Sequence, residues 1–241
     1  MKHWIDADWP AAQNVHAITT LRSGGVSTNH FASLNVADHV HDEAENVRDN
    51  RKVITQMLNL PAEPVWLQQV HSNRVIQLTH NTAGPQADAS FTHQPGIVCA
   101  IVTADCLPIL LSSKDGGIIA ALHAGWRGLL NGIISRTVKA LGKQHLIAWL
   151  GPAIGANCFE VGTEVKDQFV SKSAMFNAAF TQNNQHHYLA DIYQIARLEL
   201  EALGITGVYG GGFCTVTDHQ RFYSYRRDGE TGRMATLIWR D

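Results

Sequence analysis

Runs of apolar residues of strand length alternate with polar turns along most of the chain. Three runs, at 97–103, 107–112 and 118–124, are almost continuously apolar, which predicts strands that are covered on both faces. Other runs of strand length predict further strands, at 15–20, 65–70, 74–78, 145–150, 222–226 and 234–239. The pattern therefore predicts a protein built around β-structure.

Three segments carry apolar positions at helical spacing. Residues 42–60 predict a helix with Asp42 as its N-cap, and residues 129–141 predict a helix followed by Gly142. Residues 191–203 predict a helix that Asp191 caps and Gly204 ends. Strands and helices are interleaved, but not in strict βαβ order, and no repeat or linker divides the chain. We therefore expect one α/β domain over residues 1–241, with mixed sheets in layers.

The composition narrows the class of protein. Hydrophobic residues make up 45% of the 241 residues and charged residues 17%, which excludes an intrinsically disordered chain. A net charge of -2 leads us to expect no nucleic-acid partner. Because the start lacks an apolar leader and no apolar run is long enough to span a bilayer, we expect no membrane partner. The 4 scattered cysteines indicate a reduced, cytoplasmic protein, and the 13 histidines favour metal or proton chemistry.

Reactive side chains lie where predicted strands end, at His71, Cys106 and His123. Two imidazoles and one thiolate form a ligand set that suits zinc or copper and leaves a coordination position free. The three residues do not have zinc-finger spacing, so the fold must assemble such a site. The carboxylate of Asp105 would raise the pKa of a free thiol next to it. A bound cation overcomes that effect, which favours the metal over a free thiolate.

Two other interpretations of these residues stay open. In the first, Cys106 is a nucleophile and His123 is its base, as in a cysteine hydrolase. In the second, Cys106 is a small buried hydrophobe and the histidines are ordinary hydrogen-bonded side chains. The remaining histidine pairs, His39/His41 and His186/His187, lie in polar surroundings and indicate no site. One His-x-His pair is too few for a multicopper electron-transfer protein.

Two glycine-containing turns offer places for an anion. In His123-Ala-Gly-Trp-Arg-Gly128 a strand passes into a helix, so that backbone N–H groups and Arg127 can face a phosphate or carboxylate. Arg22, in the segment Thr20–Ser27, is a weaker candidate, because that segment is also typical of a plain turn. We therefore expect Arg127, and after it Arg22, to contact substrate.

Several longer motifs occur along nearly the whole chain. They are Arg22-x-Gly-Gly-Val-Ser27, Ser33-Leu-Asn35, Asn50-Arg51, Trp66-Leu-x-Gln-Val-His71, Ala87-Asp-Ala89, Thr103-Ala-Asp-Cys-Leu-Pro108, His123-Ala-Gly-Trp-Arg-Gly128, Gly151-Pro-Ala-Ile-Gly155, Phe159-Glu-Val-Gly162 and Phe222-Tyr-Ser-Tyr-Arg-Arg227. With these motifs the chain resembles the laccase-domain family, whose bacterial members carry the labels polyphenol oxidase, peptidoglycan editing factor and purine nucleoside phosphorylase.

The resemblance implies a layered α/β/β/α sandwich, similar to the catalytic domain of cytotoxic necrotizing factor toxins. It implies that His71, Cys106 and His123 are the catalytic residues and bind zinc, or copper in some reports. The activities attached to the family are phosphorolysis of adenosine, inosine and methylthioadenosine, and hydrolytic deamination of adenosine. The partners would then be small purine nucleosides and phosphate.

Other functions remain open beside this one. They are a metal- or cysteine-dependent hydrolase that edits miscoupled peptidoglycan precursors, a copper-dependent phenol oxidase, and a metal-carrying or partner-binding protein with only trace catalysis. Asp105 and Asp88 are the candidates for a general acid. We assign no role to Cys158 and Cys214.

Overall fold

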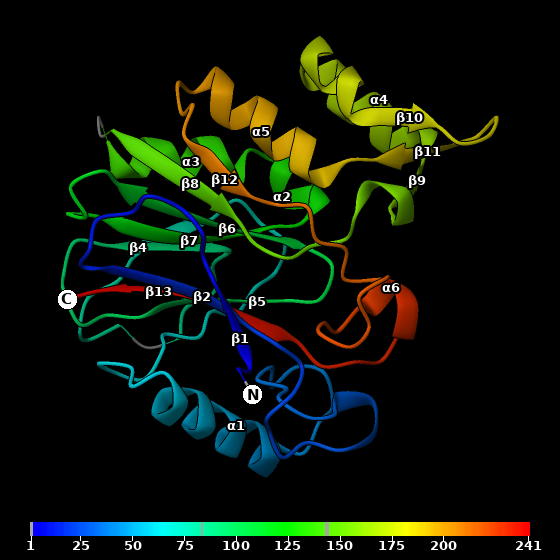
Figure 1. Ribbon diagram of the computed structural model, residues 1–241. Helices are drawn as coiled ribbons and strands as arrows, with labels where there is room; N and C mark the ends of the chain where they lie inside the picture. The colour runs from blue at the N-terminus through cyan, green and yellow to red at the C-terminus, as the bar shows by residue number, and fades with distance from the viewer. Residues whose placement is uncertain (1, 83, 143–144) are drawn as a thin grey trace.

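Two β-sheets face each other, each with helices on its outer side, in the computed structural model, which describes residues 2–82, 84–142 and 145–241 (Figure 1). The four-stranded antiparallel sheet has the order β1-β2-β13-β5, with bounds Trp4–Asp6, Val15–Thr20, Met234–Arg240 and Cys99–Thr103. The six-stranded mixed sheet has the order β12-β8-β6-β7-β4-β3, with bounds Val208–Gly210, Leu146–Leu150, Leu107–Ser113, Ile119–Ala124, Ala89–Thr92 and Val75–Gln77. A three-stranded sheet of order β10-β11-β9 lies apart from both, with bounds Phe180–Gln182, His187–Ala190 and Glu160–Gly162.

The helices form the two outer layers. Helix α1 (Ala44–Met57) covers the outer face of the four-stranded sheet, and α2 (Trp126–Leu130), α3 (Ile133–Leu141) and α5 (Ile192–Ala202) cover the six-stranded sheet (Figure 1). Helix α4 (Thr163–Lys172) packs on the three-stranded sheet, and the short α6 (Tyr225–Asp228) lies at one edge of the sandwich. The order α/β/β/α confirms the layered single-domain fold that the sequence predicts.

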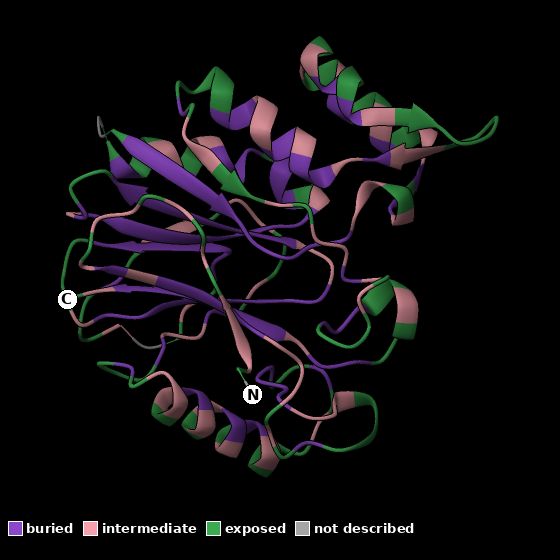
Figure 2. Cartoon of the chain, viewed as in Figure 1, coloured by how far each residue is buried: buried purple, intermediate pink, exposed green. Residues whose placement is uncertain are grey.

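The central strands are apolar on both faces because each face meets a different layer. In β6, Ile109 packs in the cluster that contains Ile133 of α3, whereas the next residue, Leu110, packs between the sheets with Ile101 of β5. A separate cluster joins Ile54 of α1 to the outer face of the four-stranded sheet. Figure 2 shows these strands buried throughout, while the helices bury only one side.

The best predicted elements are those with clear end signals. The first predicted strand coincides with β2, at Val15–Thr20. The predicted helix at 191–203 is α5, whose N-cap Asp191 accepts a hydrogen bond from the Gln194 amide at 2.9 Å. Gly204 follows it in the left-handed region, with φ +81°.

Other expectations are wrong in detail. The helix expected at 129–141 begins earlier, at Trp126, and is divided into α2 and α3, because Gly132 adopts a φ of +78° between them. The strand expected at 222–226 is absent from this described segment, since Ser224 instead accepts a hydrogen bond from the Arg227 amide and begins α6. The strand expected at 65–70 forms only isolated bridges, at Val65 and Gln68.

Asp42 is not the N-cap of α1. Glu43 occupies that position, while Asp42 accepts hydrogen bonds from Ser27 and Asn35 at 2.6 and 2.9 Å. Its carboxylate therefore ties two loops together instead of capping a helix.

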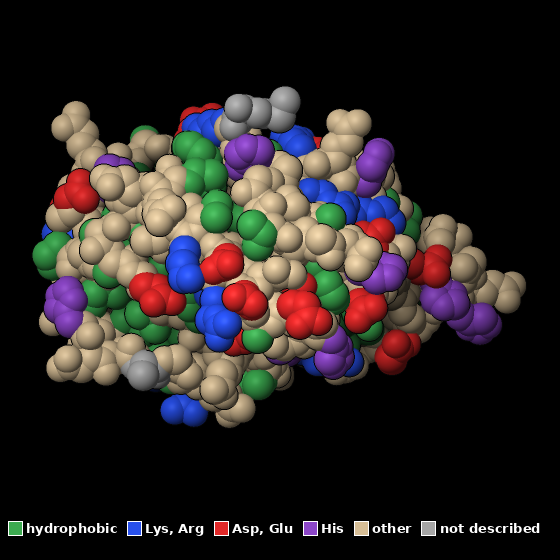
Figure 3. Space-filling view, turned by 90° about the horizontal axis from the view of Figure 1, so that it is seen from below, with side chains coloured by type: hydrophobic (Ala, Val, Ile, Leu, Met, Phe, Trp, Pro, Cys, Tyr) green, Lys and Arg blue, Asp and Glu red, His purple; other side chains and the backbone are tan. Residues whose placement is uncertain are grey.

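The surface and the helices give two further observations. Seen from the side of α1, Lys and Arg side chains are interspersed with Asp and Glu (Figure 3). Among the described residues, none of the helices combines the length and the hydropathy needed to cross a bilayer.

Candidate metal centre

His71, Cys106 and His123 lie together at one edge of the sandwich. One ligand atom from each residue lies within 4.8 Å of the other two. The His71 Nε2 is 3.7 Å from the Cys106 Sγ, and the centroids of the two imidazole rings are 4.7 Å apart. Within the described ranges this is the one group of three or more His, Cys, Asp or Glu side chains with such spacing.

The two sheets place Cys106 and His123 beside each other. Cys106 lies in the turn that carries the chain from β5 in one sheet to β6 in the other. His123 is near the end of β7 and pairs with Pro108 of β6, two residues after the cysteine. Both side chains therefore lie at the same end of the six-stranded sheet.

Gly125 allows the ligands to come this close. A Cβ atom on Gly125 would lie 2.9 Å from the Cys106 Sγ and 3.1 Å from the His71 Cδ2. Any larger residue would therefore push two of the three side chains away. The absence of a side chain at Gly125 therefore leaves room for Cys106 and His71 to approach each other.

A buried carboxylate, Asp88, orients both histidines. It accepts hydrogen bonds from the His71 amide at 2.9 Å and from the amide and hydroxyl of Ser72, both at 2.6 Å. These contacts hold His71 in a left-handed turn with φ +59°. The same carboxylate lies 2.8 Å from the His123 Nδ1, which leaves the Nε2 of that ring free for a ligand bond.

The charges at the cluster support one another. Burial disfavours the Asp88 carboxylate, yet hydrogen bonds from His123 and Ser72 outweigh it and lower the pKa of Asp88 to about 2. Burial also disfavours the Cys106 thiolate, but the adjacent His123 and His71 outweigh it and lower the pKa of that thiol. Asp88 is therefore ionised, and the cysteine is close to its metal-binding form.

Asp105 does not act as the sequence suggests. Its two oxygens accept hydrogen bonds from the Thr215 hydroxyl at 2.5 Å and from the Arg226 amide at 2.6 Å. The carboxylate thus anchors two loops at a strained turn, where Asp105 has φ +85°. Because Asp105 is fully engaged and Asp88 is ionised and buried, the structure supports neither as a general acid.

A cavity of about 430 Å³ opens beside the cluster, a size suited to a small molecule. Its apolar lining residues are Ala104, Trp126, Ile154, Phe159 and Ile192. Its polar lining residues include His39, Gln69, Arg127, Tyr225, Arg226 and Arg233. The cavity can therefore hold a molecule with one flat apolar part and one charged or polar part next to the cluster.

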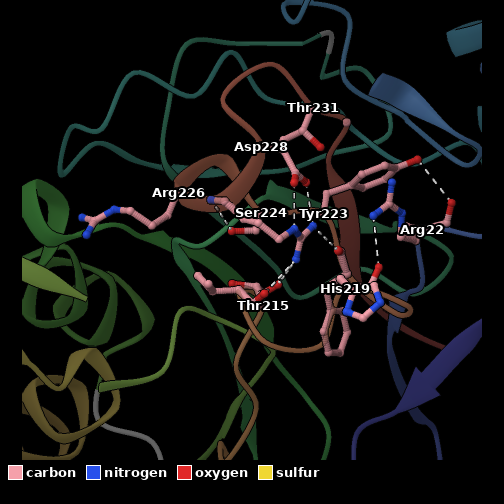
Figure 4. A network of polar contacts seen from close by, with 12 residues as sticks. Arg22, Thr215, His219, Tyr223, Ser224, Arg226, Asp228 and Thr231 are labelled. Atoms are coloured by element: carbon pink, nitrogen blue, oxygen red, sulfur yellow. Dashed lines mark hydrogen bonds and ion pairs between the residues drawn. The ribbon is translucent and has the colours of Figure 1, made fainter. Parts of the chain in front are cut away.

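The structure separates the two predicted substrate-binding arginines. Arg127 lines the cavity and stacks on Trp126, with its guanidinium 4.3 Å from the ring centroid. Arg22 is not among the described residues that line this cavity. Its guanidinium donates to the carbonyl oxygens of Ala32 and His219 and lies over the ring of Tyr223 (Figure 4). These contacts hold the Arg22 side chain outside this cavity, and its part in substrate binding stays a prediction.

Sequence reasoning missed three polar residues of the cavity, namely His39, Arg226 and Arg233. His39 belongs to a histidine pair that polar neighbours make inconspicuous, and Arg226 belongs to the basic run Tyr225-Arg226-Arg227. In Figure 4 the Arg226 side chain points away from Thr215, Ser224 and Asp228, which belong to a network of hydrogen bonds. The two adjacent arginines, Arg226 and Arg227, are the signal that the sequence offers, whereas nothing in the local pattern distinguishes Arg233.

Comparison with known proteins assigns the family. A family model described as "Multi-copper polyphenol oxidoreductase laccase" matches residues 16–241. "Purine nucleoside phosphorylase PA4543" of Pseudomonas aeruginosa is 48% identical over 242 residues, covering 99% of each chain. "Purine nucleoside phosphorylase YfiH" of Escherichia coli is 46% identical, again over 99% of each chain.

Solved structures agree with the sequence matches. The Neisseria meningitidis protein NMB0706 superposes with a TM-score of 0.96 at 45% identity, covering 100% of both chains. YlmD from Geobacillus stearothermophilus gives a TM-score of 0.92 at 30% identity over 99% of this chain and 96% of that one. On these matches and the motifs that carry them, the chain belongs to the laccase-domain family, in which its relatives bear the name purine nucleoside phosphorylase.

Proposed function

We propose that the chain is a zinc-dependent purine nucleoside phosphorylase that also deaminates adenosine by hydrolysis. The observation that carries this proposal is the meeting of His71, Cys106 and His123 beside a cavity of about 430 Å³. The names of the relatives support the reaction class. We take adenosine, inosine and methylthioadenosine as the substrates.

The donor set fits a zinc ion. Two imidazole nitrogens and one thiolate are ligands that zinc prefers, and three protein ligands leave a position for a substrate or water. The bond from His123 to Asp88 is the outer contact that zinc-binding histidines usually make. Copper accepts the same ligand types, so we include it as the alternative metal. When bound, such an ion would act as a Lewis acid and would lower the pKa of a water molecule bound to it.

The protein residues bind and orient the reactants. The aromatic residues of the cavity, Phe159 and Trp126, suit the flat purine, and Arg127 suits phosphate. In phosphorolysis a phosphate oxygen forms a bond to the anomeric carbon. The bond from that carbon to purine N9 breaks with its electron pair going to the purine, which then takes up a proton. In deamination water adds at the carbon bearing the amino group, and ammonia leaves.

The direct test is purine release from adenosine or inosine, with and without phosphate. We expect His71→Ala, Cys106→Ala and His123→Ala each to lose activity by at least about a hundredfold, because each removes a metal ligand. Elemental analysis of protein purified without a metal-affinity tag should find about one zinc per chain in the parent and little in the variants. Unchanged turnover in all three folded variants would remove the proposed site.

A second candidate is a cysteine hydrolase acting on a peptidoglycan precursor, with Cys106 as the nucleophile. It is favoured by the two imidazoles beside the thiol, that of His123 and that of His71, whose Nε2 is 3.7 Å from the Cys106 Sγ. A covalent adduct on Cys106 in an active, metal-free protein would support it over the zinc enzyme. A phenol oxidase would instead need oxygen and activity that follows bound copper. For either enzyme we propose a cytoplasmic location, because the cysteines are free thiols and one of them is a candidate metal ligand.

A further inference from the structure

The cavity beside the metal centre carries unbalanced positive charge. Three guanidinium groups line it, those of Arg127, Arg226 and Arg233. The carboxylate that lines it with them, Asp105, has both oxygens occupied by other donors. Among the described residues, no ion pair within 4.0 Å joins any of the three arginines to a carboxylate. A bound metal would add further positive charge, so this space favours an anion.

Arg233 is the most buried of these charges. Its Nη1 donates to the carbonyl oxygens of Thr231 and Gly232 at 2.7 and 3.0 Å, which fixes the group without neutralising it. Burial lowers the pKa of Arg233, an effect that the nearby Cys106 and Asp105 oppose. Arg233 is half-buried, and a partly desolvated charge without an ionic partner is unfavourable, so an anion in the cavity would compensate for it.

The other two arginines are held in fixed positions around the same space. Arg226 donates to the carbonyl oxygens of Cys158 and Glu160, and its guanidinium lies 5.6 Å from the Phe159 ring centroid. Arg127 is held by its stacking on Trp126. Each has N–H groups left for a ligand, because a guanidinium carries five donors. The arginines therefore bring positive charge to the same cavity whose aromatic residues, Trp126 and Phe159, suit a purine.

We propose that Arg233, together with Arg226 and Arg127, binds the inorganic phosphate that attacks the nucleoside. This inference rests on the proposed function and assigns its phosphate subsite. Arg233 and the metal cluster then hold phosphate close to the anomeric carbon, with its charge balanced before the bond to that carbon forms. The phosphate-independent deamination of adenosine does not need the subsite, and this difference provides an internal control.

The test compares Arg233→Gln, Arg233→Lys and Arg127→Gln with the parent in zinc-loaded protein. Arg136→Gln is the matched control, because Arg136 is an exposed arginine of α3 that does not line the cavity. Calorimetry measures binding of inorganic phosphate alone, and kinetics give separate KM values for phosphate and inosine. We expect Arg233→Gln to weaken phosphate binding and raise the phosphate KM about 10- to 100-fold. The phosphate KM should change more than the inosine KM or the rate of adenosine deamination does, and Arg233→Lys should recover part of the loss. Arg136→Gln should leave all three within about twofold of the parent.

The outcomes separate the inference from the proposed function. A parent protein that binds zinc but releases no purine with phosphate would overturn the function itself. A normal phosphate KM in folded Arg233→Gln and Arg127→Gln would overturn the subsite and leave the function intact. Turnover of a 5′-nucleotide without added phosphate, lost in Arg233→Gln, would show that the anion belongs to the substrate and would also overturn the inference. If Arg233→Gln does not fold, the exposed Arg127→Gln variant and sulfate competition in the parent decide the matter.

Discussion

The carboxylate of Asp88 contacts the backbone of His71 and the side chain of His123, although it cannot reach the cavity itself. Asp88→Asn keeps the size of the side chain but removes the charge that both histidines face. We expect zinc affinity to fall about 10- to 100-fold, as for other losses of an outer-shell partner. Competition with a chromophoric chelator measures this. The control is Asp115→Asn, a carboxylate that accepts similar hydrogen bonds in an exposed turn. Equal affinity in Asp88→Asn and the parent would contradict the positioning role.

Gly125 offers a second test at the scale of one atom. In Gly125→Ala the new methyl group would lie 2.9 Å from the Cys106 Sγ, so the ligands must separate. We expect zinc affinity to fall by about tenfold or more, with the circular dichroism spectrum unchanged. Gly117→Ala is the control, because its methyl group would meet only the side chain of Asp115, at 3.3 Å. Full zinc content in Gly125→Ala at limiting metal would show that the cluster tolerates wider spacing.

At the scale of elements, the break between α2 and α3 depends on Gly132, whose φ is +78°. We expect Gly132→Ala to lower the free energy of unfolding by about 1–2 kcal/mol, the cost of a left-handed conformation for an L-residue. A Cβ there would also lie 2.9 Å from the Ser135 Oγ, so the comparison is repeated in a Ser135→Ala background. Urea unfolding measures both, and Gly132→Asn should cost less because Asn tolerates this conformation. An Ala variant as stable as the parent would mean that α2 and α3 can merge.

Glu199 of α5 provides a prediction about pH. It is buried, one of its oxygens lacks a hydrogen-bond partner, and the Lys172 Nζ of α4 is 3.8 Å from it. Burial raises the pKa of Glu199 above its usual 4.5, an effect that Lys172 only partly opposes. The folded state therefore holds this proton more tightly, and stability falls as pH rises above 4.5 through the folded pKa. We expect Glu199→Gln to be more stable than the parent at pH 8, and the difference in Tm between the two proteins to shrink towards pH 4. Thermal unfolding at each pH measures this difference. A Glu199→Gln variant less stable than the parent at pH 8 would mean that the attraction between Glu199 and Lys172 outweighs the cost of burying the carboxylate.

Elements were predictable where local signals and packing agree. Helix α5 has an N-cap, an apolar face and a glycine stop, so its bounds follow from the sequence. The apolar spacing of 129–141 continues across Gly132, and only the three-dimensional packing shows that this glycine ends α2. Phe222 and Tyr223 are buried aromatics typical of a strand, yet the contacts of Arg227 with the carbonyl oxygens of Thr215 and Phe222 fix a different path.

The residues of the candidate site also differ in whether the sequence alone predicts them. His71, Cys106 and His123 follow or interrupt apolar runs, so their types and positions were enough to select them. Arg233 precedes β13 in an ordinary loop, and its place in the cavity depends on which distant segments meet there. Local patterns indicate the ends of strands, but they do not indicate which loops share a cavity, so they do not distinguish Arg233 from other loop arginines.

At the scale of the whole molecule, both sheets contribute to the site, so the site should survive only as long as the sandwich does. Leu110 of β6 is fully buried between the sheets. We expect Leu110→Ala to cost about 2–5 kcal/mol, which lowers Tm by about 2–4 °C per kcal/mol for a chain of this size. The exposed Leu203→Ala, at 39% exposure, is the control and should change stability by less than about 0.5 kcal/mol.

The decisive measurement follows zinc release, tryptophan fluorescence and circular dichroism during one thermal unfolding. If residues 1–241 form one cooperative unit, the three signals share a midpoint, and Leu110→Ala moves all three together. Added zinc should raise that common midpoint, because it binds the folded state, and Cys106→Ser should remove the rise while leaving the metal-free midpoint nearly unchanged. Zinc release well below the main transition would instead show that the edge carrying Cys106 and His123 opens independently of the sheets that support it.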